Sequence, residues 1–142
     1  MANRLFMKEV EQMLCLGKQV VLRVKGLSML PFIVGDEDSV ELQKADMVKI
    51  GDIVLADIPQ RGYVLHRIIE ENELGVILMG DGNIKGCELC KREDIKGKVV
   101  RILKKNGRVV ECKERFYRFK VNVWKICLPI RRYLLAMYKI IR

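Results

Sequence analysis

The sequence predicts a mainly β domain: a rolled, antiparallel, barrel-like sheet with a short N-terminal helix and a helical C-terminal extension. Short runs rich in β-branched residues follow one another at close spacing, and turn residues separate them. Strands do not alternate with long amphipathic segments, as they would in a βαβ fold. The 142 residues are 50% hydrophobic and 32% charged, which is the composition of a globular chain long enough to bury a core.

The first element expected is a short amphipathic helix within residues 2–18. Asn3 is a candidate N-cap, and Gly17 is a suitable C-terminal stop. Apolar residues recur near helical spacing and define the face expected to pack: Leu5, Phe6, Val10, Met13 and Leu14.

Six or seven short strands are expected next. The runs with strand character are 19–26, 39–45, a segment within 49–59 that Pro59 ends, 63–71, a segment within 74–83 that enters a glycine turn, and two segments within 95–112. The turn at 60–62 predicts a hairpin between the third and fourth runs, and Lys105-Asn106-Gly107 predicts another between the last two.

The basic character of the chain belongs to its C-terminal end. The net charge is +9, yet residues 1–114 hold 19 basic and 18 acidic residues, whereas residues 115–142 hold 8 basic residues and no acidic one. We therefore divide the chain into a catalytic-type domain, 1–112, and a basic amphipathic helical tail, 113–142.

The tail has two helical sides, with a kink or a second helix start expected at Pro129. The polar side comprises Arg115, Arg118, Asn122, Lys125, Arg132, Lys139 and Arg142, and the apolar side comprises Phe116, Phe119, Val123, Ile126, Ile130, Leu134, Met137 and Ile141. An apolar side rimmed by Lys and Arg is typical of a helix in a membrane interface, where anionic lipid adds about 1 kcal/mol per basic residue. The alternative is that the apolar side packs on the sheet and the basic side is solvated. Nucleic acid is not an expected partner, because the aromatic residues lie on the apolar stripe.

Cysteine usage and hydropathy bear on location. Five cysteines, an odd number, and no recognisable secretory signal predict reduced thiols. No uncharged run approaches the roughly 20 apolar residues of a membrane span, so we expect a cytoplasmic or peripherally membrane-associated protein. The pair in "CELC", Cys87 and Cys90, is half of a zinc site without its second half, so neither a metal nor a cofactor is expected.

Two residues combine into a candidate catalytic pair. Ser28 follows a glycine in "GLSMLP", and His66, in "YVLHRII", is the only histidine in the chain. Either residue by itself fits an ordinary structural role. Together they offer a hydroxyl nucleophile and a base that can take its proton near neutral pH. A carboxylate would then hold the imidazole, and both Asp81 in "MGDGN" and Glu88 in "GCELC" are candidates.

In order along the chain, "GLSMLP", "GDIVLADIP", "YVLHRII", "LMGDGN" and "IKGKVV" resemble the motifs of type I signal peptidases, within the superfamily that these enzymes share with self-cleaving SOS repressors. The His66-Arg67 pair stands where the bacterial enzymes have Lys-Arg, so the chain is similar to the histidine-containing archaeal and endoplasmic-reticulum subtype. The resemblance runs from about Val24 to Val100.

The resemblance implies a serine endopeptidase that cleaves a signal or leader peptide after small residues. Ser28 would be the nucleophile, His66 the general base, and the Ser28 N–H an oxyanion donor, while Asp81 matches the glycine-aspartate motif beside the active site. The substrate would add as an extended strand. Two features depart from the family: Cys87 stands where the subtype has a second aspartate, and the N-terminal membrane anchor is missing.

The orienting acid therefore stays open between Asp81 and Glu88. The alternative function is a catalytically inactive relative that binds peptide or a membrane surface through its tail. A self-cleaving regulator would need a lysine base and a DNA-binding region, for which the first 23 residues are too short.

Overall fold

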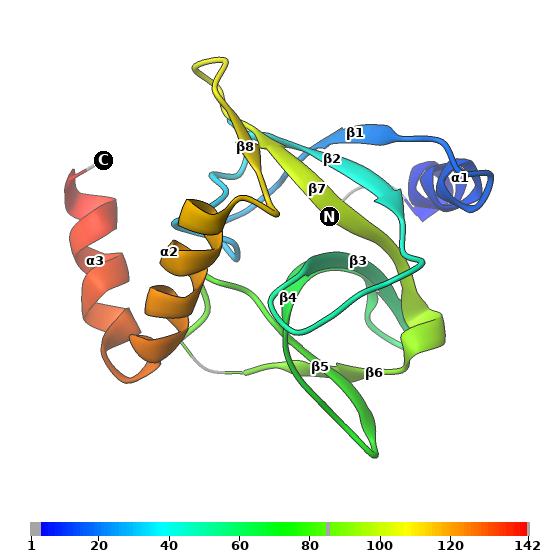
Figure 1. Cartoon of the computed structure of the whole chain (residues 1–142). Coiled ribbons are helices and arrows are strands. Elements are labelled where there is room, and N and C mark those ends of the chain that lie inside the picture. Colours follow the sequence, from blue (N-terminus) through cyan, green and yellow to red (C-terminus); the bar gives the residue numbers. More distant parts are fainter. Residues whose placement is uncertain (1–3, 85, 142) are drawn as a thin grey trace.

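The structure, a computed structural model, describes residues 4–84 and 86–141, and a curled antiparallel sheet lies at its centre (Figure 1). The sheet has eight strands in the order β1-β2-β7-β3-β4-β5-β6, and β8 pairs with β7 outside that path. The curl gives the sheet the form of half a barrel, so the predicted fold class is confirmed.

The elements follow the predicted order. They are α1 (Arg4–Cys15), β1 (Val20–Arg23), β2 (Ser39–Lys44), β3 (Ile53–Ile58), β4 (Gly62–Asn72), β5 (Gly75–Met79), β6 (Glu88–Cys90), a 3-10 turn (Arg92–Asp94), β7 (Ile95–Leu103), β8 (Val109–Glu111), α2 (Arg115–Ile126), a second 3-10 turn (Leu128–Ile130) and α3 (Arg131–Ile141). Seven of the strands match predicted runs. The exception is β6, a three-residue strand within "CELC" that the sequence did not indicate.

The packed face of the N-terminal helix agrees only in part with the one expected. Val10 and Leu14 are buried as predicted, together with Met7, whereas Leu5, Phe6 and Met13 are exposed. This narrow stripe, spaced by three and four, packs against β1, β2, β4 and β7. Gly17 ends the helix with a positive φ of 84°, as predicted, and Asn3 lies outside the described residues.

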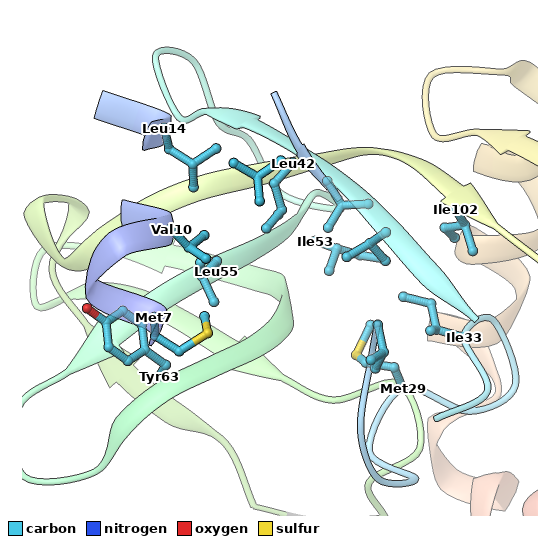
Figure 2. Close-up of a cluster of buried hydrophobic side chains, with 14 of the residues drawn as sticks. Met7, Val10, Leu14, Met29, Ile33, Leu42, Ile53, Leu55, Tyr63 and Ile102 are labelled. Carbon is cyan, nitrogen blue, oxygen red and sulfur yellow. The ribbon is translucent and has the colours of Figure 1, made fainter. Parts of the chain in front are cut away.

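The main core fills the concave side of the sheet (Figure 2). Leu14 from α1, Leu42 from β2 and Ile53 from β3 converge there and are almost fully buried. Each such side chain contributes about 1.5–3 kcal/mol relative to an exposed one. Met29 and Ile33 join the same core, so the segment after Ser28 is anchored by apolar contacts.

The tail forms two helices, and Pro129 lies in the 3-10 turn between them, where a kink was expected. The side predicted to be apolar is not the packed one. Tyr117 and Val121 of α2 and Leu135 of α3 are buried instead. Figure 1 shows both helices at the side of the molecule opposite α1. Arg142 and the side chain of Ile141 lie outside what the structure describes.

Among the described residues, the helices are all too short or too polar to reach across a bilayer.

Candidate active site

The one histidine of the chain forms a close pair with a glutamate. His66 Nδ1 lies 2.5 Å from Glu88 Oε1, and both side chains are nearly buried. The other carboxylate oxygen of Glu88 lies 3.2 Å from Arg61 Nη2, at the mouth of the pair. Glu88 is therefore held between a buried ring and a surface guanidinium, which fixes the orientation of the imidazole.

Strand register explains how residues from β4 and β6 meet across β5. Arg67 pairs with Met79, so continuing the same antiparallel register by one residue places Gly80 beside His66. Glu88 pairs with Leu78, two residues before Gly80. Residues paired across strands, and residues two apart along one strand, share a face of the sheet. By this register His66 and Glu88 lie on the same face.

The serine loop, which we define as residues 24–34, lies on that same side of Gly80. A Cβ added to Gly80 would approach the Ser28 carbonyl oxygen to 2.3 Å, and a Cβ on Gly82 would approach the Leu27 carbonyl oxygen equally closely. The Gly82 N–H donates to the Ser28 carbonyl oxygen over 2.7 Å. Two glycines thus let the serine backbone rest on the chain segment that follows β5. Asp81 is the residue that the sequence motif pointed to, but the glycines on either side of it, Gly80 and Gly82, are the ones that contact the serine loop.

Three polar groups at this place have no hydrogen-bond partner in the described part of the chain. They are the Ser28 hydroxyl, the Ser28 backbone N–H and Nε2 of His66. Among the described residues, the only fully buried side-chain nitrogen or oxygen without a partner is Nε of Arg131, so Nε2 of His66 reaches solvent. Ser28 and His66 are not hydrogen-bonded to each other.

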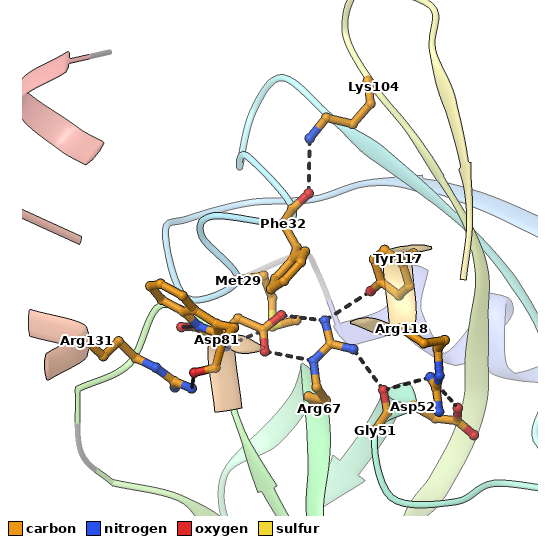
Figure 3. Close-up of polar contacts among 11 residues, drawn as sticks. Met29, Phe32, Gly51, Asp52, Arg67, Asp81, Lys104, Tyr117, Arg118 and Arg131 are labelled. Atoms are coloured by element: carbon orange, nitrogen blue, oxygen red, sulfur yellow. Dashed lines mark hydrogen bonds and ion pairs between the residues drawn. The ribbon is translucent and has the colours of Figure 1, made fainter. Parts of the chain in front are cut away.

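Asp81 does not contact His66, contrary to its expected place in the catalytic set. Its two carboxylate oxygens accept hydrogen bonds from Nε and Nη2 of Arg67 at 2.8 and 2.6 Å (Figure 3). Arg67 follows His66 in β4, so its side chain points to the opposite face, and it also donates to Tyr117 Oη and the Gly51 carbonyl. Of the two candidate acids, the structure brings Glu88 to His66 and Asp81 to Arg67.

The Arg67–Asp81 pair is deeply buried. Arg67 is 4% exposed, and the Phe32 and Tyr117 rings flank its guanidinium. Burial opposes the charge of Arg67, but the Asp81 carboxylate outweighs it and holds the pKa of Arg67 above its usual value. Burial raises the pKa of Tyr117, so its hydroxyl stays protonated as a neutral partner. This network joins β4, the Gly80–Asn83 segment and α2.

The tail helices hold both segments that flank the serine. Trp124 Nε1 donates to the Asp81 carbonyl oxygen over 2.7 Å, and Arg131 Nη1 donates to the Asn83 carbonyl over 3.2 Å. Leu135 packs with Leu30 and Val34 of the serine loop. These contacts could not be predicted from the sequence, because they depend on which side of each tail helix faces the rest of the protein.

The far end of the serine loop is fixed by a buried carboxylate. Asp38 accepts hydrogen bonds from the Val34 N–H, the Lys105 N–H and Lys104 Nζ, at 2.8, 3.1 and 2.7 Å. Burial disfavours the charge, but these hydrogen bonds outweigh it and lower the pKa of Asp38. Lys104 Nζ also donates to the Phe32 carbonyl, which ties the loop to the β7–β8 hairpin (Figure 3).

The "CELC" pair is split by β6. Cys87 is exposed and Cys90 is buried, and burial together with nearby Asp94 and Glu88 raises the pKa of Cys90 to about 11. In the residues that the structure covers, no three potential metal ligands come together. The segment contributes Glu88 to the site. Cys87, at the position of the subtype's second aspartate, makes no polar contact with His66 in the part of the chain that the structure describes.

No protein-family model and no curated protein matches this chain. The resemblance to type I signal peptidases therefore rests on the five ordered motifs alone.

Proposed function

We propose that this protein is a serine endopeptidase in which Ser28, His66 and Glu88 form the catalytic set. The observation that carries the proposal is the His66–Glu88 pair, in which a carboxylate occupies Nδ1 while Nε2 has no hydrogen-bond partner in the described part of the chain. With Nδ1–H donating to Glu88, the neutral ring presents Nε2 as a proton acceptor. That tautomer is the one a general base for serine needs.

The proposed reaction has two halves, acylation of Ser28 and its deacylation by water. Ser28 Oγ attacks the scissile carbonyl carbon while Nε2 of His66 takes its proton. The new oxyanion accepts a hydrogen bond from the Ser28 N–H. Nε2 then gives the proton to the leaving amine, the C–N bond breaks, and an acyl-serine remains. Water then attacks the acyl-serine by the same steps and releases the carboxylic acid product. The mechanism requires the Ser28 hydroxyl and Nε2 of His66 to come into hydrogen-bond contact when substrate binds, as is common when a site tightens around substrate.

The substrate is a peptide bound in extended form, of the signal or leader class, cut after small residues. Among the described strands β1 stands at one end of the sheet, and it leads directly into the serine loop. A peptide strand adding along this edge would gain main-chain hydrogen bonds and run toward Ser28. The serine loop lies directly on Gly80 and Gly82, which leaves little depth for a large side chain next to the scissile bond.

The test compares cleavage of a peptide library rich in Ala-x-Ala sites, with anionic liposomes present and products read by mass spectrometry. The chain has only two serines, so Ser39→Ala is a matched control for Ser28→Ala. Wild type and Ser39→Ala are expected to cut the same sites, whereas Ser28→Ala and His66→Ala lose at least 100-fold in rate.

Equal cleavage by wild type and Ser28→Ala would overturn the proposal. If all variants are folded and inert, the second candidate replaces it: a non-catalytic relative that keeps the fold and binds peptide. The absence of a hydrogen bond between Ser28 and His66 is the observation that favours this second candidate.

A further inference from the structure

The outer faces of α2 and α3 are apolar and exposed, although other apolar residues of the same helices are buried. Phe119 is 63% exposed and Ile126 is 78% exposed, whereas Tyr117 and Val121 are buried. We call the exposed set the tail surface. Its members are Phe116, Phe119, Val123, Ile126, Ile130, Tyr133, Met137 and Ile140.

Helical geometry shows that this exposure is systematic. At about 100° per residue, Phe116, Phe119, Val123 and Ile126 share one side of α2, and Tyr117, Val121 and Trp124 share the other. In α3, Tyr133, Met137 and Ile140 lie opposite Leu135 and Arg131. Each helix therefore has two apolar sides. One packs on the rest of the protein, and the other remains without a partner in the described structure.

Charge identifies the kind of partner. Lys120 and Arg115 border the exposed apolar side of α2, and Arg132 and Lys139 border that of α3, while residues 115–142 include no acidic residue. A partner for this surface must have an apolar interior and a surface that is negatively charged throughout. An anionic bilayer has both properties, since acyl chains lie beneath phosphate headgroups.

A groove extends the apolar surface from α2 to the β7–β8 hairpin. It has a volume of about 390 Å³, and its lining combines Phe32, Ile102, Val110 and Phe119 with the cations Lys104, Arg108 and Lys120. Apolar walls with cations beside them suit an acyl chain with its anionic headgroup. The rest of the tail surface lies on the convex outer sides of two helices, which suits a broad planar partner.

We propose that the tail surface docks on anionic lipid bilayers, with α2 and α3 lying in the interface. This inference depends on exposure and charge, and it is independent of the proposed peptidase activity. Because the same helices contact the serine loop and Asn83, docking would also set the position of the candidate active site relative to the membrane. Leu27 and Ile84, which are exposed on the two segments flanking Ser28, would come near the membrane surface, so the natural peptide would be presented there.

The experiment is cosedimentation of the full chain with vesicles of phosphatidylcholine, with and without 30% phosphatidylglycerol. Ile126→Ser removes an exposed tail residue, and Leu16→Ser, at a position 75% exposed on the opposite side of the molecule, is its matched control. We expect binding to anionic vesicles that weakens with salt, about tenfold weaker binding for Ile126→Ser, and no change for Leu16→Ser. Lys139→Gln should weaken binding about fivefold, and Lys18→Gln should leave it unchanged.

Equal binding to neutral and anionic vesicles, or equal effects of Ile126→Ser and Leu16→Ser, would overturn the proposal. So would concentration-dependent dimerisation in sedimentation velocity that Ile126→Ser abolishes, because a second copy would then be the occupant. Ser28→Ala should bind vesicles like wild type, so vesicle binding and peptide cleavage can fail separately.

Discussion

His66 on β4 and Glu88 on β6 are in contact across an intervening strand, at 2.5 Å between Nδ1 and Oε1. Glu88→Gln keeps the shape of the side chain and can still contact the ring, but it no longer favours the Nδ1–H tautomer or stabilises the imidazolium. We expect a fall in kcat/KM of about 100-fold or more, measured on the peptide that the library identifies. Arg61→Gln, which removes only the outer partner of Glu88, should change the rate less than tenfold. A Glu88→Gln enzyme as fast as wild type would remove Glu88 from the catalytic set.

Gly80→Ala tests the close approach of the serine loop. The new Cβ would lie 2.3 Å from the Ser28 carbonyl oxygen, which belongs to the backbone, so the loop must move. We expect a loss of about 1–3 kcal/mol in the free energy of unfolding and a larger loss of cleavage than of stability. Gly107→Ala in the distant hairpin, where a Cβ meets nothing but φ is positive, should lower stability by about 1 kcal/mol without affecting kcat/KM.

Breaking the Arg67–Asp81 pair should destabilise the fold. Asp81→Asn leaves a buried guanidinium without its counter-charge, and we expect a decrease of about 3–5 kcal/mol in the free energy of unfolding, measured by urea denaturation. Asp46→Asn, in an exposed pair with Lys44, should cost less than about 1 kcal/mol. The double variant Arg67→Met/Asp81→Leu should recover part of the loss. Unchanged stability of Asp81→Asn with lost activity would return Asp81 to the catalytic set.

Asp38 predicts a pH dependence of stability. Its pKa in the folded state lies below the usual 3.8, so the unfolded chain binds the proton more tightly. The stabilisation is therefore complete above the unfolded pKa and is lost as pH falls through the folded value. Asp38→Asn should be less stable than wild type at pH 7, by about 1.5–3 kcal/mol, and the difference should shrink near pH 3. Asp36→Asn, at an exposed position, should show only a small difference in urea midpoints at pH 7.

Trp124→Phe tests the hold of the tail on the Asp81 segment. The substitution removes the donor to the Asp81 carbonyl and keeps an aromatic ring against Arg131. We expect a loss of about 1–2 kcal/mol in stability, with a decrease in kcat/KM and no change in vesicle binding. Tyr133→Phe, on the exposed side of α3, should leave stability and kcat/KM at wild-type values. If Trp124→Phe leaves both values unchanged, the tail does not position the site.

The strands could be predicted because alternation, β-branched residues and turn chemistry agreed along 19–112. The exception, β6, has only three residues and no alternation, and its pairing with β5 is a long-range effect. The choice between Asp81 and Glu88 depended on that missing strand, so the sequence could not make it. In the tail the helical period was clear, but each helix has two apolar sides, and periodicity cannot say which one packs. Which side packs is determined by the surface that each helix meets, which is formed by the serine loop and β4.

The contacts of Leu135 and Trp124 with the serine loop and the Asp81 segment also bear on the order in which the molecule is built. The two ends of the Leu30–Leu135 contact lie roughly a hundred positions apart, and such contacts form late because their loop-closure entropy is high. On the ribosome, the sheet can close while the serine loop still lacks its outer support. The serine loop of the nascent protein thus gains its outer support only after the tail helices have emerged.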